Sequence, residues 1–250
     1  MRISLRFVLF PAIVMGITIT LYGCKKEKFQ TNPVNGTSDA IFNSNKTYGT
    51  LTDQDGNIYK TITIGNQTWM AENLRTTIFR NGEPIPEVTD KTGWENTSTA
   101  AYCNPNNIFN ADSITTYGRL YNWFAAYSTT NIAPKGWHVP TLDEWITLIT
   151  SLGGVDIAGG KLKETGLSHW SNPNECANNE SGFTALPGVD RKLDLGFTNA
   201  YARLQSSWWT STQDGSETPP YLDVEYNNCK VFNTSGTNNH TGLYIRLVKD

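Results

Sequence analysis

One capped amphipathic helix, flanked on both sides by short alternating segments, constrains the fold of this chain more than any other sequence feature. Thr141 precedes an apolar stripe and Glu144 follows it by three residues, which is the pattern of a capping box. The stripe continues at helical spacing and ends before a Gly-Gly pair. We therefore predict a helix over 141–152 with Trp145 on its buried face, and a second short helix over 155–164.

Segments of alternating hydrophobicity lie before and after these helices. Residues 58–64 alternate with a period of two, a Gly-Asn pair offers a two-residue turn, and residues 67–70 return, which predicts a β-hairpin. Further strand-like segments cover 207–211, 221–226, 229–232 and 243–247. Helices in the middle and strands at both ends predict an α+β fold with mostly antiparallel strands and two or three short helices.

The segment between the hairpin and the capped helix is rich in turn residues. Pro, Gly and Asn recur over 76–116, so we expect long irregular loops there. Residues 118–127 carry Leu and aromatic side chains at helical spacing, which predicts a short buried helix.

Composition excludes several classes of protein. Aromatic residues make up 12% of the chain and charged residues 17%, a balance that excludes a disordered chain. The formal net charge is −3 and the chain has no long basic run, so we expect no nucleic-acid partner.

The first 23 residues have the pattern of a bacterial lipoprotein signal peptide. Arg2 and Arg6 precede an apolar run over 7–21, which is shorter than the roughly 20 residues of a membrane span. Residues 21–24, Leu-Tyr-Gly-Cys, resemble a lipobox. We expect cleavage before Cys24 and lipidation of its thiol, which would make the membrane a partner through the lipid anchor. An ordinary secretory signal and a retained membrane anchor are the alternatives.

This pattern divides the chain into three parts and predicts its location. Residues 1–23 are the expected signal peptide, residues 24–47 are polar and predict a flexible lipid-anchored tether, and residues 48–250 form the expected domain. We expect an outer-membrane lipoprotein of the cell envelope, exposed on the cell surface.

Six segments line up in order with one known family. They are residues 52–61, 65–74, 117–123, 133–141, 181–188 and 208–211. Through them the chain resembles the Fibrobacter succinogenes major paralogous domain, common in lipoproteins of the Bacteroidetes–Fibrobacteres group, from residue 50 to 250. The resemblance implies a single C-type-lectin-like domain, related to the formylglycine-generating-enzyme-like fold, in which N- and C-terminal strands pair. It implies no catalytic residue and no established activity.

Aromatic side chains are one candidate for ligand binding. The faces of tryptophan rings can stack on sugars, and we consider Trp94, Trp170 and Trp208 as ligand-binding residues. A place in the core is the alternative, since most of the 8 Trp must be buried in a domain of this size.

Acidic side chains are the second candidate, as calcium ligands. Asp223 and Glu225 alternate outward on a predicted strand and would form a metal site with Asp214 or Glu217. A solvated strand face is the alternative. The Asp-Gln-Asp-Gly segment at 53–56 is interpreted as a turn rather than a calcium loop, because the remaining ligands of an EF-hand are absent. Otherwise we expect no cofactor.

Histidines and cysteines show no catalytic or metal-binding spacing. His138 lies just before the capped helix and is interpreted as a structural, hydrogen-bonded residue beside Thr141, Glu144 and Trp145. After the expected cleavage the cysteines other than Cys24 number three, at positions 103, 176 and 229, so at least one is unpaired within a monomer. The spacing does not select a disulfide.

These observations favour a non-catalytic binding or adhesion module at the cell envelope. The spacer, the lectin-like resemblance and the Asn/Thr/Gly-rich loops support that reading, with a glycan as the leading ligand and a protein ligand as another. An enzyme on a formylglycine-generating-enzyme-like fold and a scaffold for a protein partner without a small ligand are the alternatives.

Overall fold

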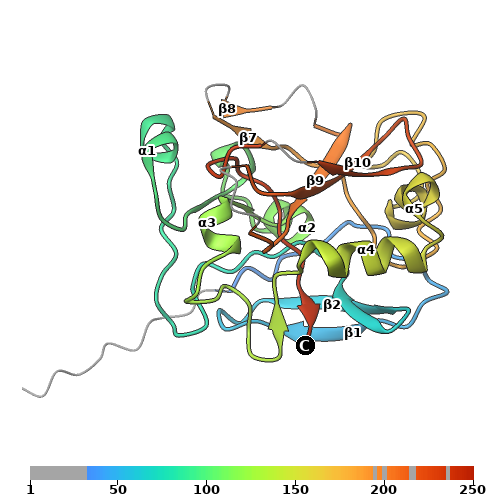
Figure 1. The fold of residues 1–250 in the computed structure, drawn as a ribbon, viewed down its shortest axis with the longest axis horizontal. Helices are drawn as coiled ribbons and strands as arrows, with labels where there is room; N and C mark the ends of the chain where they lie inside the picture. Colours follow the sequence, from blue (N-terminus) through green and yellow to red (C-terminus); the bar gives the residue numbers. More distant parts are fainter. Residues whose placement is uncertain (1–32, 194–195, 199–201, 214–217, 235–236) are drawn as a thin grey trace, which may run out of the picture.

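An antiparallel five-stranded sheet forms one layer of this computed structural model, which describes residues 33–193, 196–198, 202–213, 218–234 and 237–250 (Figure 1). Its strands are β1 (Gly49–Thr52), β2 (Ile58–Ile64), β3 (Gln67–Met70), β6 (Trp137–His138) and β12 (Val248–Lys249). They lie in the order β1-β2-β3-β12-β6. The last strand, β12, pairs with β3, so strands from early and late parts of the sequence are neighbours in this sheet.

A smaller sheet lies across the domain from the first. It contains β9 (Gln205–Trp209), β10 (Tyr221–Glu225) and β11 (Val231–Thr234) in the antiparallel order β11-β10-β9. Two short antiparallel pairs join β4 (Tyr102–Cys103) to β5 (Leu120–Tyr121) and β7 (Arg191–Lys192) to β8 (Gly196–Phe197). Figure 1 shows helix α4 (Leu142–Ser151) between the two larger sheets. The predicted α+β fold with antiparallel strands is confirmed.

The described residues contain five α-helices, more than the two or three predicted. Besides α4 they are α1 (Lys91–Asn96), α2 (Ala111–Tyr117), α3 (Trp123–Ala126) and α5 (Val155–Leu162), with a short 3₁₀ turn at Pro105–Asn107. Helices α1 and α2 lie in the region predicted to be loops, where Asp90 and Asn110 cap them with their side chains. Within the described residues, no helix has both the length and the apolar character needed to cross a membrane.

Two predicted elements are shorter than expected or shifted. Of the helix predicted over 118–127, only the part that forms α3 is helical. Leu120 and Tyr121 pair with β4 instead, and Asn122 caps α3 through its side chain. The strand predicted near the C-terminus is shifted: residues 248–249 form β12, and residues 243–247 do not form a continuous strand. Residues 243 and 244 make only isolated bridges, to Tyr121 and Trp208.

The core lies on both faces of the larger sheet. Trp145 of α4 is buried between Trp69 of β3 and Trp208 of β9, with ring centroids 4.7 Å and 5.9 Å away. A second cluster, which includes Tyr59, covers the opposite face. Both faces of strand β2 are therefore covered by core residues over most of its length, and Ile58 at its start is 53% exposed.

The segment predicted as a flexible tether packs on the domain over its described part. Val34 is buried and its N–H donates to Asn57 Oδ1 at 2.7 Å. The N–H of Gly36 donates to Thr115 Oγ1 of α2, also at 2.7 Å. Within the predicted tether, residues 34–43 therefore make hydrogen bonds to the domain that local polarity does not reveal, whereas residues 44–47 are exposed. We name residues 33–41 the strap; residues 24–32 and Cys24 lie outside the described residues.

A disulfide joins Cys176 to Cys229, a pairing that spacing alone could not select. Cys229 also accepts a backbone hydrogen bond from Gly160 of α5, so the bond ties the turn before β11 to this helix. Cys103 is a free, buried thiol in β4, and burial raises its pKa to about 11.

Candidate functional site

The three tryptophans predicted to form an exposed binding surface are buried. Trp94, Trp170 and Trp208 have exposed fractions of 1%, 0% and 0%. Their indole N–H groups donate to the carbonyl oxygens of His240 and Ala185 and to Asn73 Oδ1, respectively. The expectation that these rings are available for stacking is wrong, because each polar N–H already has a partner inside the protein.

The acidic residues proposed as calcium ligands lie on β10, but the described residues do not gather a metal site around them. Asp223 accepts a hydrogen bond from Ser207 Oγ at 3.3 Å, and burial together with the charges of Asp190 and Glu225 raises its pKa to about 8. Among the described residues, the one group of three potential ligands within 4.8 Å contains Glu175 and the two disulfide cysteines. Asp214 and Glu217 lie outside the described residues, so the calcium site stays a prediction.

His138 is held by hydrogen bonds on both ring nitrogens. Nδ1 lies 2.6 Å from Asp250 and Nε2 lies 2.7 Å from Glu144. Glu144 also accepts from the N–H of Thr141, so the capping box of α4 and the end of the chain meet at this ring. Burial lowers the pKa of His138, but the two carboxylates outweigh that effect and the net shift is upward. These contacts give His138 a structural role, because its ring connects Glu144 at the start of α4 to Asp250.

Two residues of the family-like segment 65–74 form a buried polar network. Asn73 Oδ1 accepts from the Trp208 indole at 2.9 Å and from Arg246 Nε at 2.8 Å, while its Nδ2 donates to the carbonyl oxygen of Tyr117 at 2.8 Å. Gly118 follows with φ +81°, and a Cβ there would lie 2.6 Å from Asn73 Cβ. The preceding Glu72 accepts a hydrogen bond from the backbone N–H of Lys60. Asn73 therefore connects β9, the C-terminal segment and the end of α2, and Glu72 binds to β2.

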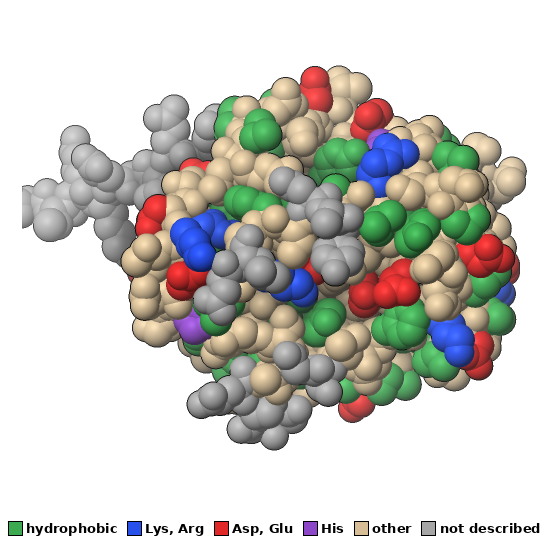
Figure 2. Space-filling view, turned by 90° about the horizontal axis from the view of Figure 1, so that it is seen from above, with side chains coloured by type: hydrophobic (Ala, Val, Ile, Leu, Met, Phe, Trp, Pro, Cys, Tyr) green, Lys and Arg blue, Asp and Glu red, His purple; other side chains and the backbone are tan. Residues whose placement is uncertain are grey.

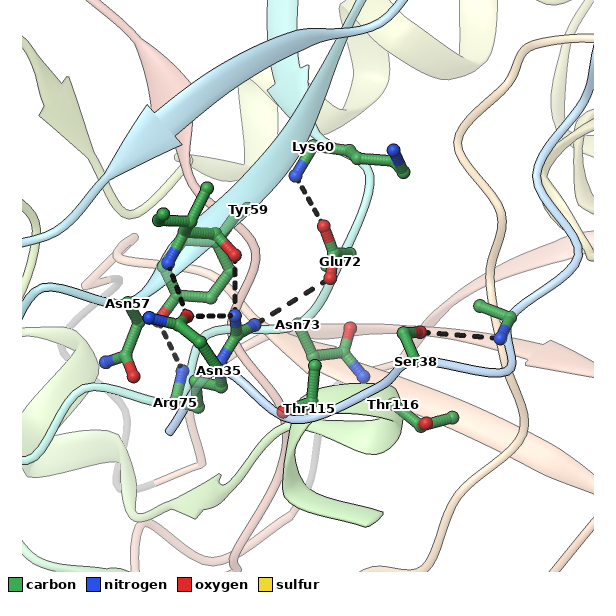
Figure 3. Close-up of polar contacts among 12 residues, drawn as sticks. Asn35, Ser38, Asn57, Tyr59, Lys60, Glu72, Asn73, Arg75, Thr115 and Thr116 are labelled. Atoms are coloured by element: carbon green, nitrogen blue, oxygen red, sulfur yellow. Dashed lines mark hydrogen bonds and ion pairs between the residues drawn. The ribbon is translucent and has the colours of Figure 1, made fainter. Parts of the chain in front are cut away.

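A polar pocket of about 270 Å³ lies between the strap, β2 and α2. We name it the strap pocket; it is lined by Asn35, Gly36, Ser38, Thr50, Ile58, Tyr59, Lys60, Glu72, Arg75 and Thr115. Figure 3 shows the Arg75 guanidinium between Asn35 and Glu72. Arg75 is buried against the ring of Tyr59, with its guanidinium carbon 4.2 Å from the ring centroid.

Arg75 and Glu72 leave two polar atoms without hydrogen bonds. Arg75 Nε donates to the Val34 carbonyl and Nη2 donates to the Ile58 carbonyl and to Asn35 Oδ1. Nη1 is buried and has no hydrogen-bond partner among the described residues; it lies 3.8 Å from Glu72 Oε1, too far for a hydrogen bond. Burial raises the pKa of Glu72, and the Lys60 N–H and the Arg75 charge partly oppose this.

A second hollow, of about 200 Å³, lies beside the C-terminal half of α2. We name it the Tyr117 groove; its walls include Ile108, Pro187 and Val189, and Asn106, Ser113 and Tyr117 line it with polar groups. The hydroxyls of Ser113 and Tyr117 and the amide of Asn106 make no side-chain hydrogen bond to a described residue. Arg203 lies at the same groove and donates to the carbonyls of Leu167, Ser168 and Trp170.

The Tyr117 groove continues into a polar hollow formed with the strap. Ser113 and Tyr117 also line this hollow, together with Thr37, Asp39, Asp112 and Thr116. On its other side, the ring of Tyr117 packs edge-on against His169, with centroids 5.8 Å apart. His169 lies between Glu164 and Asp39 and so links the strap to the wall of the groove.

Sequence reasoning singled out none of Lys60, Arg75 and Tyr117 as site residues. Tyr117 begins one of the family-like segments and Glu72 lies within another, but a motif does not show which of its side chains remain unpaired. The path of the strap was a second obstacle, because strap residues line the strap pocket and the polar hollow beside the Tyr117 groove.

Comparison with known proteins gives one match. The family model described as Fibrobacter succinogenes major domain matches residues 62–249. No curated protein and no solved structure matches the chain. The C-type-lectin-like topology implied by the resemblance therefore stays a prediction.

Proposed function

The chain belongs to the Fibrobacter succinogenes major domain family, and on that premise we propose that it is an exported, lipid-anchored binding module of the cell envelope whose ligand is a glycan. The Tyr117 groove carries this proposal. It combines a half-buried tyrosine ring, apolar walls and three polar groups that make no side-chain hydrogen bond to a described residue. Ligand sites are concave and mostly apolar, with a few polar groups that fix orientation.

The groove suits a sugar better than a purely apolar ligand. A pyranose ring presents C–H groups on its faces and hydroxyls around its edge. The ring of Tyr117 offers a surface for the first, and Asn106 and Ser113 offer donors and acceptors for the second. At about 200 Å³ the groove is smaller than most drug-sized ligand sites, which begin at roughly 300 Å³, and it fits a single sugar residue of a longer chain.

The alternative of an enzyme finds its best candidate at His138, and the geometry there disfavours it. Ser211 lines the same hollow as His138, as a nucleophile and base would. However, the Ser211 hydroxyl donates to the Val139 carbonyl at 2.8 Å. Both nitrogens of His138 are engaged by carboxylates, so neither is directed at Ser211.

The face shown in Figure 2 supports a ligand other than nucleic acid. The face in Figure 2 carries basic and acidic side chains in small separate groups among polar and hydrophobic ones. A nucleic-acid-binding surface would instead show a continuous basic patch.

The anchor is tested separately from the ligand. The protein should partition into the detergent phase after expression in its native envelope, and Cys24→Ser or globomycin should abolish this. Protease accessibility on intact cells then distinguishes the exterior face that we propose from the periplasmic one. Retention in the membrane with an uncleaved N-terminus, measured by mass spectrometry, would refute lipidation of Cys24.

A glycan array, followed by titration calorimetry with and without calcium, tests the ligand. Tyr117→Ala should weaken binding of a glycan hit about fivefold or more, because truncating a central aromatic contact that acts as a hot spot costs over about 1 kcal/mol. Tyr117→Phe keeps the ring and should retain most of the affinity. Tyr127→Ala is the matched control, since Tyr127 is 43% exposed and stacks on Trp123 outside the groove. Equal affinities of the Tyr117→Ala and Tyr127→Ala variants would refute the groove.

A further inference from the structure

In the strap pocket, an N–H donor of Arg75 and a carboxylate oxygen of Glu72 form an ion pair without a hydrogen bond between them, at a separation that one hydroxyl group can bridge. Arg75 Nη1 is buried without a hydrogen-bond partner among the described residues, and Glu72 Oε1 lies 3.8 Å from it. A hydroxyl can accept from an N–H and donate to a carboxylate at the same time. The two side chains form an ion pair at this distance, and their other hydrogen bonds hold them too far apart for a direct hydrogen bond.

The positions of these two groups are fixed from three sides. The strap binds Arg75 through the Val34 carbonyl and Asn35, β2 binds it through the Ile58 carbonyl, and Glu72 is held by the N–H of Lys60. A ligand therefore meets prearranged partners, which lowers the entropic cost of binding.

The rim of the pocket adds the positive charge of Lys60. Lys60 lines the pocket and is exposed, and its ammonium forms no ion pair with a described residue. Its nitrogen lies 5.1 Å from the ring centroid of Phe42 and 6.0 Å from that of Tyr48. Together Lys60, Glu72 and Arg75 carry a net charge of +1, which favours a ligand with one negative charge over a neutral ligand.

We propose that the strap pocket is a binding subsite for an acidic sugar residue, with a ring hydroxyl between Arg75 and Glu72 and the carboxylate near Lys60. This inference rests on the proposed glycan-binding function and adds the chemical class of one residue of the glycan. The pocket, at about 270 Å³, has room for one such residue.

Two glycosides that differ only in the carboxylate test the charge. Methyl β-glucuronide and methyl β-glucoside are titrated into the full chain by NMR. The glucuronide should bind about fivefold more tightly, as expected for a partly exposed ion pair. Lys60→Met removes the charge and keeps an apolar stem against Phe42 and Tyr48, so it should reduce this ratio to about one. Lys135→Met removes an exposed lysine that does not line the pocket and should leave the ratio unchanged.

The hydroxyl bridge has its own readout. Glu72→Gln should weaken both glycosides to a similar degree, because the bridge is common to them. If this variant fails to fold, the Arg75 side-chain signals of the wild-type protein serve instead, and they should shift on saturation with either glycoside. Arg75 signals that stay unchanged would mean that water alone occupies the gap, and the inference would fall.

The outcomes separate this inference from the proposed function. If Tyr117→Ala abolishes binding of array glycans while Lys60→Met leaves the glucuronide-to-glucoside ratio unchanged, the glycan function stands and the acidic subsite is refuted. If the wild-type protein binds no glycan on the array and neither glycoside, both are refuted. A ratio near five that only Lys60→Met removes supports the subsite.

Discussion

Replacing Asn73 tests whether the polar network around the family-like segment holds the two sheets together. Its side chain makes three hydrogen bonds, which connect β9 through Trp208, the C-terminal segment through Arg246 and the end of α2 through the Tyr117 carbonyl. Asn73, Trp208 and Arg246 are all buried, so water cannot replace the lost partners. We expect Asn73→Ala to be among the most destabilising single changes in the protein.

The magnitude follows from the three bonds. A buried donor left without a partner costs about 1–3 kcal/mol, and the two donors affected are the Trp208 indole and the charged Arg246 guanidinium. Loss of the bond to the Tyr117 carbonyl adds about 0.5–1.5 kcal/mol. The sum is about 2.5–7.5 kcal/mol, a large part of the roughly 5–15 kcal/mol by which domains are stable. Asn73→Asp keeps the acceptor for both donors and should cost markedly less.

Urea unfolding followed by tryptophan fluorescence measures the loss. Asn81→Ala is the control, because Asn81 is exposed and its side chain only accepts from the nearby N–H of Glu83. We expect this control to stay within about 1 kcal/mol of the wild type. A loss below about 1 kcal/mol for Asn73→Ala, with an unchanged slope of the unfolding free energy against urea, would refute the reasoning.

Three further predictions concern a helix cap, the hydrogen bonds of His138 and the disulfide. Thr141→Ala should lower the free energy of unfolding by about 1 kcal/mol through the lost cap, while Thr147→Ala, on the exposed face of α4, should not; equal urea midpoints would contradict this. The raised pKa of His138 means that its stabilisation is complete below the unfolded value near 6.5 and is lost as pH rises through the folded pKa. The stability deficit of His138→Ala should therefore be largest in mild acid and shrink toward pH 9, and a pH-independent deficit would contradict it. Replacing Cys176 and Cys229 with serine should cost about 2–4 kcal/mol, measured by thermal unfolding with and without reductant, and a reductant-insensitive wild type would argue otherwise.

Local sequence patterns were sufficient to predict the elements that depend only on residues close to one another in the sequence. The capping box at Thr141 and Glu144 fixes the start of α4, and alternation around a Gly-Asn turn fixes β2 and β3. Helices α1 and α2 were missed because they have six and seven residues, too few for a clear apolar period, although Asp90 and Asn110 are ordinary caps.

The candidate sites were less predictable than the fold because they depend on contacts between distant segments. Trp94 and Trp170 lie in polar, turn-rich sequence, yet their rings are buried. Their indole N–H groups donate to the carbonyls of His240 and Ala185, which are distant in the sequence. The Tyr117 groove and the strap pocket each require segments that are far apart in the sequence. No sequence pattern indicates that one nitrogen of Arg75 lacks a hydrogen bond, because that depends on the path of the strap.

The boundaries of the family domain bear on where ligand specificity resides. The matched region covers residues 62–249, so it contains Glu72, Arg75 and Tyr117 but excludes the strap and Lys60. The strap contributes Asn35 and the residues around it to one hollow and Thr37 and Asp39 to another. Because the residues of the family-like segments around Asn73 are engaged in structural hydrogen bonds, they constrain the scaffold more than the ligand. We therefore expect strap exchange between family members to transfer ligand preference more readily than exchange of the 65–74 segment.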